Sequence, residues 1–184
     1  GTAAIARQLK NMVVEQMAAI DKVAKLSTAL GIATEDILKF SHAAKLTGVS
    51  QETLNKGLQI LVRRLGEAKA GWGEGAKKIQ LLGLSAAELA GKTTAEAMKD
   101  IAEAISRIPD KATRAAAAYA LFEEQGTELL NFLQSGRGGL EAMGDELERL
   151  GGLFNNLQGN QVEAAVDELT RVDKALDGLK TRLT

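Results

Sequence analysis

The sequence predicts an all-α protein, a compact bundle of short helices flanked by two long amphipathic, coiled-coil-like helices. Apolar residues recur at helical spacing, no stretch alternates apolar and polar residues with period two, and β-branched residues never cluster. Aromatic residues make up only 3% of the chain, so the core must consist of Leu, Ala, Ile and Val. We expect a first long helix at 1–30, a compact multi-helix module at 31–155 and a second long helix at 156–184.

Each expected long helix carries a stripe of apolar residues. Steps of four and three alternate along the first stripe, which is the spacing of a coiled-coil seam. This first stripe consists of Ile5, Leu9, Met12, Ala19, Val23, Leu26 and Leu30, with Gln16 as its one polar member. The second stripe consists of Val162, Ala165, Leu169, Val172, Leu176, Leu179 and Leu183.

The two stripes predict self-association. Soluble proteins seldom leave apolar patches of more than a few hundred Å² in water, so each stripe must be covered by the other stripe or by another copy. We expect a homo-oligomer held through the long helices. The residues expected at this interface are Ile5, Leu9, Met12, Val23, Leu30, Val162, Leu169, Val172, Leu176, Leu179 and Leu183. Gln16 is expected to set the register of the association.

Capping residues and glycines divide the middle of the chain into short helices. A Ser, Thr or Asp side chain that accepts a hydrogen bond from the first turn is expected at Thr34, Ser50, Ser85, Thr93 and Asp110. Glu88 and Glu96 complete capping boxes with Ser85 and Thr93. Glycines are expected to end or separate helices at Gly31, Gly48, Gly83, Gly126, Gly136, Gly138 and Gly139. This pattern predicts a folded module and not a straight rod.

Residues 71–94, GWGEGAKKIQLLGLSAAELAGKTT, contain two glycine patterns that resemble nucleotide-binding motifs. A phosphate-binding loop has the form Gly-x-x-x-x-Gly-Lys-Ser/Thr and lies between a strand and a helix. Here Ala86 replaces the first glycine of the pattern that ends in Gly91-Lys92-Thr93, and no sheet is expected. The second pattern, Gly71-x-Gly73-x-x-Ala76, follows a helix. We therefore interpret these glycines as turns between helices and expect no cofactor.

Other residues that often carry chemistry are isolated in this chain. His42 is the only histidine and shares a helix side with Leu38, Leu46 and Val49, which favours half-buried packing over metal binding. The acidic segments 122–128 and 144–148 lack the ligand spacing of a calcium loop and are interpreted as solvated helix ends. Trp72 is expected to fold back onto the nearest helix, with a partner hot spot as the alternative. We predict no catalytic residue, no metal site and no enzymatic activity.

Charge and hydropathy exclude further classes of protein. The net charge of −1 argues against a general nucleic-acid binder. Residues 1–83 carry +5 and residues 84–184 carry −6, so the two halves are expected to attract one another within or between copies. No apolar run approaches the ~20 residues of a membrane helix. The chain has no cysteine, which excludes disulfides and thiolate chemistry. It begins GTAAIARQLK, without Met, and we expect it to be a fragment of a longer chain.

The order of several segments is more distinctive than any single motif. Residues 30–54, LGIATEDILKFSHAAKLTGVSQETL, run through Leu-Gly-Ile, a helix with a Ser/Thr cap, Ala-Ala, Gly-Val-Ser and a leucine helix. This order resembles a module of the tail tape-measure proteins of bacteriophages and prophages. Similar segments follow at 66–89, 96–122, 126–143, 150–154 and 167–179, so the resemblance covers about residues 21–180. The sequence departs from the family after Phe122, where the family commonly has Gly-x-Ser-Gly and this chain has Glu123, Glu124, Gln125 and Gly126.

The resemblance implies a structural role in a phage tail. Tape-measure proteins lie in several copies inside the growing tail tube, set its length and leave with the DNA at infection. The resemblance therefore implies a location in the virion tail lumen, or in the host cytoplasm during assembly. It also implies that the partners are tube, tip or chaperone proteins of the tail. Because a helix advances 1.5 Å per residue, only extended helices measure length, and we expect the middle module to serve assembly or partner contact.

Two other classes of function remain open. One is a cytosolic helical adaptor, unrelated to tails, that uses its long helices to dimerise. The other is an enzyme fragment, because tape-measure chains sometimes carry domains that cut the cell wall. Such a domain would need a catalytic carboxylate in a substrate cleft, and no carboxylate in the sequence stands out for that role.

Overall fold

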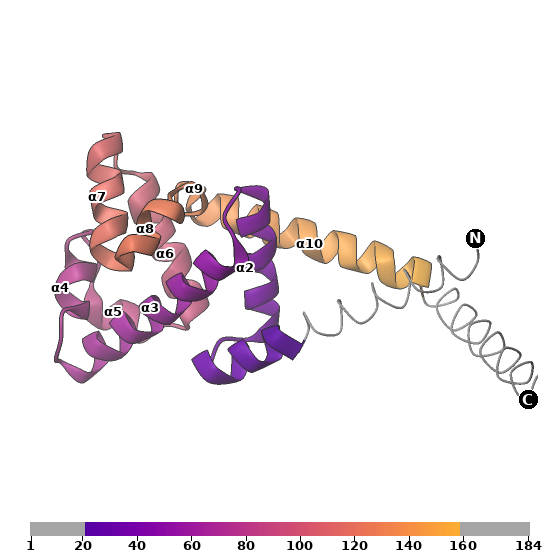
Figure 1. Cartoon of the computed structure of the whole chain (residues 1–184), viewed down its shortest axis with the longest axis horizontal. Helices are drawn as coiled ribbons and strands as arrows, with labels where there is room; N and C mark the ends of the chain where they lie inside the picture. The colour runs from indigo at the N-terminus through magenta and orange to yellow at the C-terminus, as the bar shows by residue number, and fades with distance from the viewer. Residues whose placement is uncertain (1–20, 159–184) are drawn as a thin grey trace, which may run out of the picture. The chain divides into compact units, whose positions relative to one another are not determined.

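The computed structural model describes residues 21–158, and within this range the chain is helical and contains no strand (Figure 1). One compact unit covers Ile20–Leu147, and the remaining described residues, 148–158, belong to a second unit. Most of the residues expected in the self-association stripes lie outside the described range. These are Ile5, Leu9, Met12, Val162, Leu169, Val172, Leu176, Leu179 and Leu183.

The two remaining stripe residues, Val23 and Leu30, lie in a helix at 21–30. Both are partly buried against the core of the compact unit, together with Leu26. Gly31 follows this helix with a φ of +64°, a left-handed conformation that favours glycine and ends a helix. The C-terminal end of the first stripe therefore packs, at least in part, against the core of the same chain.

Helix α2 (Thr34–Leu46) packs one face into the core through Ile37, Phe40, Ala43 and Ala44. Its N-cap residue is Ala33, whose side chain makes no capping bond, so the prediction that Thr34 caps this helix was wrong by one position. Glu35 and Asp36 lie in the first turn, where carboxylates stabilise the positive end of the helix dipole without a cap. Gly48 follows the helix with a φ of +75°.

Helix α3 (Gln51–Ala70) is the element against which most of the others pack (Figure 1). Ser50 caps it as predicted, because the Ser50 hydroxyl accepts from the N–H of Thr53. The apolar face of α3 buries Leu54, Leu58, Leu61 and Leu65. Helices α4 (Gly75–Gln80) and α5 (Ala86–Ala90) pack against this helix after a turn at 71–74.

Helices α5, α6 and α7 confirm the predicted caps. Helix α5 is capped by Ser85, helix α6 (Thr94–Ser106) by Thr93, and helix α7 (Lys111–Phe122) by Asp110. In each case the side-chain oxygen accepts a hydrogen bond from the N–H three residues later. These caps satisfy N–H groups that have no partner within the helix, which is why the helices begin at these residues.

The break after α7 lies at Glu123, and the prediction of a break at Gly126 was wrong. Glu123 has φ 58° and ψ −140°, while Gly126 lies inside helix α8 (Glu124–Glu128). A Cβ atom at position 126 would lie 2.2 Å from the carbonyl oxygen of Ala118. Gly126 therefore allows α8 to pack closely against α7 and does not separate helices. A short helix α9 (Leu130–Leu133) follows.

The last described helix, α10 (Gly136–Gln158), begins earlier than predicted, and Gly138 and Gly139, which were expected to precede it, lie inside it. Gly136 is its first residue and has a φ of +65°, so Gly136 marks the break before this helix as predicted. Each interior glycine costs a helix about 1 kcal/mol relative to alanine. Leu140, which follows Gly139 in α10, is buried in the core. The expected module boundary at residue 155 falls within this helix.

The core of the compact unit contains residues from α2 to α10, and Leu, Ile and Ala predominate as expected. Phe40 from α2 and Phe132 from α9 meet edge to face, with ring centroids 5.8 Å apart. This contact joins two helices that lie far apart in the sequence.

Candidate functional site

The outer face of α2 borders a depression in the surface of the compact unit. The depression has a volume of about 590 Å³ and lies among α2, the start of α3 and α10. Its lining consists of Leu38, Ser41, His42, Lys45, Gly48, Val49, Ser50, Gln51 and Leu147. Leu38 is 43% exposed, although α2 also carries buried residues on its inner face.

His42 forms part of the wall of this depression. Its side chain is 17% exposed, which confirms the predicted half-buried position. The His42 Nε2 atom lies 3.6 Å from Glu146 Oε2 and is buried, with no hydrogen-bond partner in the described part of the chain. His42 therefore packs between α2 and α10. Residues 21–158 contain no group of three or more His, Asp or Glu side chains that could hold a metal ion.

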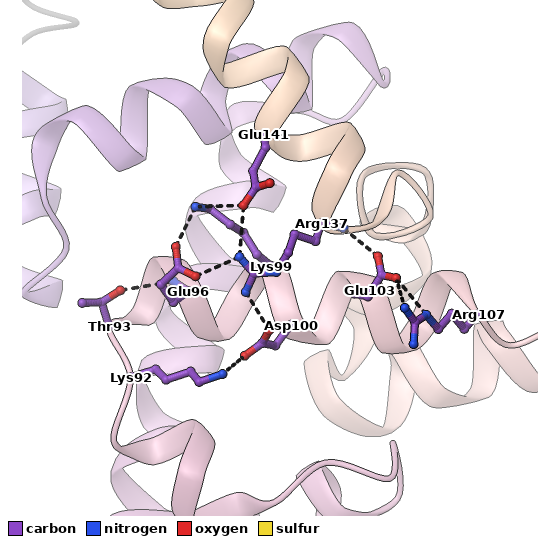
Figure 2. Close-up of polar contacts among 9 residues, drawn as sticks. All are labelled: Lys92, Thr93, Glu96, Lys99, Asp100, Glu103, Arg107, Arg137 and Glu141. Carbon is purple, nitrogen blue, oxygen red and sulfur yellow. Dashed lines mark hydrogen bonds and ion pairs between the residues drawn. The ribbon is translucent and has the colours of Figure 1, made fainter.

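A network of charged side chains joins α6 to α10 (Figure 2). The guanidinium group of Arg137, in the first turn of α10, donates to Asp100 Oδ1 at 2.6 Å, to Glu96 Oε2 at 2.9 Å and to Glu141 Oε1 at 3.0 Å. Lys99 lies 2.7 Å from Glu96 Oε1 and 3.7 Å from Glu141 Oε1. The network holds the start of α10 against one face of α6.

The pKa values within this network follow from its hydrogen bonds. Hydrogen bonds from Lys99 and Arg137 lower the pKa of Glu96. Burial raises the pKa of Asp100, but hydrogen bonds from Lys92 and Arg137 outweigh burial, and its net pKa is lowered. Hydrogen bonds to Asp100 and Glu96 raise the pKa of Arg137. The network is therefore charged at neutral pH and stabilises the contact between α6 and α10.

A second ion-pair cluster joins α3 to the break at Glu123. Arg64 is buried, and its guanidinium donates to Glu123 Oε1 at 3.0 Å and to Glu67 Oε2 at 3.3 Å. Arg63 also pairs with Glu123. Both arginines belong to the basic half of the chain and Glu123 to the acidic half, so the predicted attraction between the halves occurs here within one copy.

The nucleotide-like segment forms turns and caps. Thr93 caps α6, and Lys92 Nζ donates to Asp100 Oδ2 at 2.6 Å (Figure 2). Gly71 and Gly73 have φ values of +73° and +75° in the turn between α3 and α4. These residues therefore connect helices, as predicted from the sequence.

Trp72 lies in that turn and is 67% exposed, so the expectation that it folds back onto a helix was wrong. The turn is fixed by its neighbours, because a Cβ at Gly75 would lie 2.2 Å from the carbonyl oxygen of Arg64. With α4 held this close to α3, the indole points into solvent. An exposed Trp in a fixed turn fits the alternative of a contact residue.

Neither the outer face of α2 nor Arg137 was predicted as a site from the sequence. The relevant signal for the first was present, since Leu38, His42 and Leu46 were already placed on one helix side. Arg137 carried no local signal, because its partners on α6 lie 37 and 41 residues away in sequence.

Comparison with models of protein families, with curated proteins and with solved structures finds no match to this chain. Among residues 21–158, none of the helices is both long enough and apolar enough to span a membrane.

Proposed function

We propose that this chain is a structural module of a phage or prophage tail tape-measure protein, acting in tail assembly and length determination. In this proposal the two apolar stripes, in the long helices expected at 1–30 and 156–184, associate between copies, and the parts of these helices outside the compact unit at 21–147 contribute measured length. The folded module between them serves assembly or contact with tube, tip or chaperone proteins. The chain then works in the tail lumen, and in the host cytoplasm during assembly, without catalysis.

The strongest support comes from the place where this chain departs from the family pattern. The family commonly has Gly-x-Ser-Gly after the Phe, which corresponds here to residues 123–126. Glu123 has a φ of 58° and a ψ of −140°, a conformation that glycine adopts without strain. Gly126, which matches the last glycine of the pattern, has no room for a Cβ atom. Both glycine positions of the pattern therefore have a structural reason in this fold.

The first segment of the resemblance gives further support. Ala43 and Ala44, the Ala-Ala of the pattern, are buried where α2 meets the core. Gly48, Val49 and Ser50, the Gly-Val-Ser of the pattern, serve in turn as a left-handed residue, a core residue and the cap of α3. Each motif residue has a folding role, as a family-wide structural module would require.

The adaptor alternative predicts a different location. To separate the two, tails would be purified from cells that express the parent gene, and peptides from residues 34–147 would be quantified by mass spectrometry. We expect these peptides in intact tails, in more than one copy per particle. Peptides confined to the soluble cell extract would contradict the tail role and favour the adaptor.

A zymogram of the same fractions tests the enzyme-fragment class, and cell-wall clearing by this chain would contradict the non-catalytic proposal.

A further inference from the structure

Helix α10 carries one row of apolar residues that continues past the compact unit. Leu140 is buried in the core and Met143 is partly buried against it, so the row faces the core near the start of the helix. Steps of four and three residues continue the row at Leu147, Leu150, Phe154 and Leu157. The compact unit ends at Leu147, and the end of α10 belongs to a second unit, Gly1–Ala19 with Glu148–Thr184. Beyond the compact unit the row therefore needs a different cover, since proteins seldom leave such a row in water.

The C-terminal stripe has the spacing that covers this row if the chain turns back on itself. From Leu157 toward the N-terminus, steps of three, four and three residues lead to Phe154, Leu150 and Leu147. From Val162 toward the C-terminus, the same steps lead to Ala165, Leu169 and Val172. Antiparallel helices that place Leu157 opposite Val162 therefore place every later pair in register. The largest side chain, Phe154, is then opposite the smallest, Ala165, which is the match of sizes that close packing favours.

The residues between the two rows carry the sequence signals of a turn. Gly159 follows the last described residue of α10, and glycine is the residue most favoured just after a helix. Asn160 is a favoured N-cap residue, and Glu163 lies three residues later, where a capping box has its acidic residue. Two antiparallel helices joined by a loop of about two to five residues form a common motif, and these residues suit such a loop.

One continuous straight helix does not bring the two rows onto a common face. Val162 follows Leu157 by five residues, whereas each row uses steps of three and four. Five residues turn a helix by about 140° beyond one full turn, so the two rows would lie on different faces of that helix. A single partner helix would then cover one row and leave the other in water.

We propose that the C-terminal stripe folds back on α10 of the same chain as an antiparallel helical hairpin, with its turn at Gly159 and Asn160. The stripe lies outside the described residues, and the end of α10 supplies the face that it covers. The occupant belongs to the same chain because a short turn holds the stripe beside α10 at an effective concentration that a second copy does not reach in dilute solution.

The hairpin leaves room for association between copies. A two-helix hairpin covers its apolar seam from one side only, and helix bundles commonly pack four helices around one core. Stripes of other copies therefore pack against the same seam. Under the proposed function, the hairpin must open at residues 159–160 before the second long helix adds to measured length. This last statement rests on the tail role, whereas the hairpin itself does not.

Disulfide formation in the full 184-residue chain tests the hairpin, because the chain has no cysteine of its own. The test variant carries L150C with L169C, and the control carries L150C with V162C. In the hairpin, position 169 is opposite position 150, and position 162 is displaced from it by about 10 Å along the helix axis. In a straight helix the order is reversed, with position 162 about 18 Å and position 169 about 28 Å from position 150. A disulfide requires Cα atoms within about 7 Å.

We expect the disulfide between positions 150 and 169 to form within one chain, at least about tenfold faster than the control disulfide. Non-reducing gels and mass spectrometry of peptides measure both rates and separate disulfides within a chain from those between chains. All the changed residues lie outside the compact unit, so folding of that unit does not depend on them.

Three results would overturn the hairpin. The first is a control disulfide that forms as fast as the test disulfide or faster. The second is a disulfide between positions 150 and 169 that forms only between chains, which would assign this face of α10 to a second copy. The third is faster disulfide formation in a variant with L150C and L9C, which would assign the face to the N-terminal stripe. None of these results depends on where the protein works, so the tail role stands or falls separately.

Discussion

Gly126 and Gly66 show how the same residue type serves different purposes in this chain. Both lie inside helices, Gly126 in α8 and Gly66 in α3. A Cβ at Gly126 would lie 2.2 Å from the Ala118 carbonyl oxygen, whereas a Cβ at Gly66 would have no atom within 4 Å. Close approach of the backbone explains Gly126, while Gly66 has no such role.

This difference predicts opposite effects of alanine. Gly126→Ala should lower the free energy of unfolding by at least about 2 kcal/mol, because α7 and α8 must separate to admit the methyl group. Gly66→Ala should raise it by roughly 0.5–1 kcal/mol, because alanine loses less entropy in a helix. Urea denaturation followed by circular dichroism measures both. Equal effects of the two substitutions would mean that α7 and α8 do not pack as described.

Glu123 combines a backbone cost with an electrostatic gain. Its φ of 58° is costly for a residue with a Cβ, by about 1–3 kcal/mol. Its carboxylate compensates by pairing with the buried Arg64 at 3.0 Å. The two contributions are separated by comparing alanine with glycine at this position.

We predict that Glu123→Ala is the least stable of the three chains, because it keeps the backbone cost and leaves Arg64 without this partner. Glu123→Gly loses the same ion pair but relieves the backbone, so it should be more stable than Glu123→Ala by about 1 kcal/mol or more. The measurement is again the free energy of unfolding in urea. A glycine variant no more stable than the alanine variant would show that the backbone at 123 is not strained.

At the scale of helices, local signals in the sequence predicted most of the residues at which the helices begin and end. Ser50, Thr93 and Asp110 cap helices because a cap needs only a side chain and the N–H three residues on. The interior glycines of α10 and the break at Glu123 were missed, because both depend on contacts with distant helices. The outward position of Trp72 likewise depends on how closely α4 approaches α3.

The network between α6 and α10 predicts a dependence of stability on pH. The pKa values of Glu96 and Asp100 are lowered in the folded protein. Their contribution to stability is therefore complete above their ordinary values of about 4 and is lost as pH falls through the lowered values. The pKa of Arg137 is raised further above neutral pH and does not affect the acid range.

We expect Arg137→Gln to lower the free energy of unfolding by about 1–2 kcal/mol at pH 7, and by less at pH 3, where the carboxylates gain protons. The matched control is Arg107→Gln, since Arg107 is exposed and pairs with Glu103. Urea denaturation at a series of pH values measures both variants. A loss for Arg137→Gln that is the same at pH 3 and pH 7 would contradict the role assigned to these ion pairs.

At the scale of the whole molecule, the apolar stripes predict an assembly. Val23 and Leu30 already pack against the core, so substitutions there disturb the module as well as any interface. Leu169 and Leu176 lie in the C-terminal stripe and allow a more selective test. Replacing both with Asp should reduce the mass measured by light scattering from a multiple of 19.4 kDa toward that of one chain. An unchanged mass would show that this stripe is not an interface.

The central claim is that residues 21–147 remain a folded module, and do not measure length, within a tape-measure protein. A tandem duplication of these residues in the parent gene tests it through tail length in electron micrographs. As a straight helix the added segment would be roughly 190 Å long, at 1.5 Å per residue. As a compact domain it would be only about 36 Å across. A straight coiled-coil insert of equal length serves as the control and should lengthen the tail by the larger amount. We predict that the duplication lengthens tails by no more than the width of a compact domain, and lengthening equal to that of the control would contradict the claim.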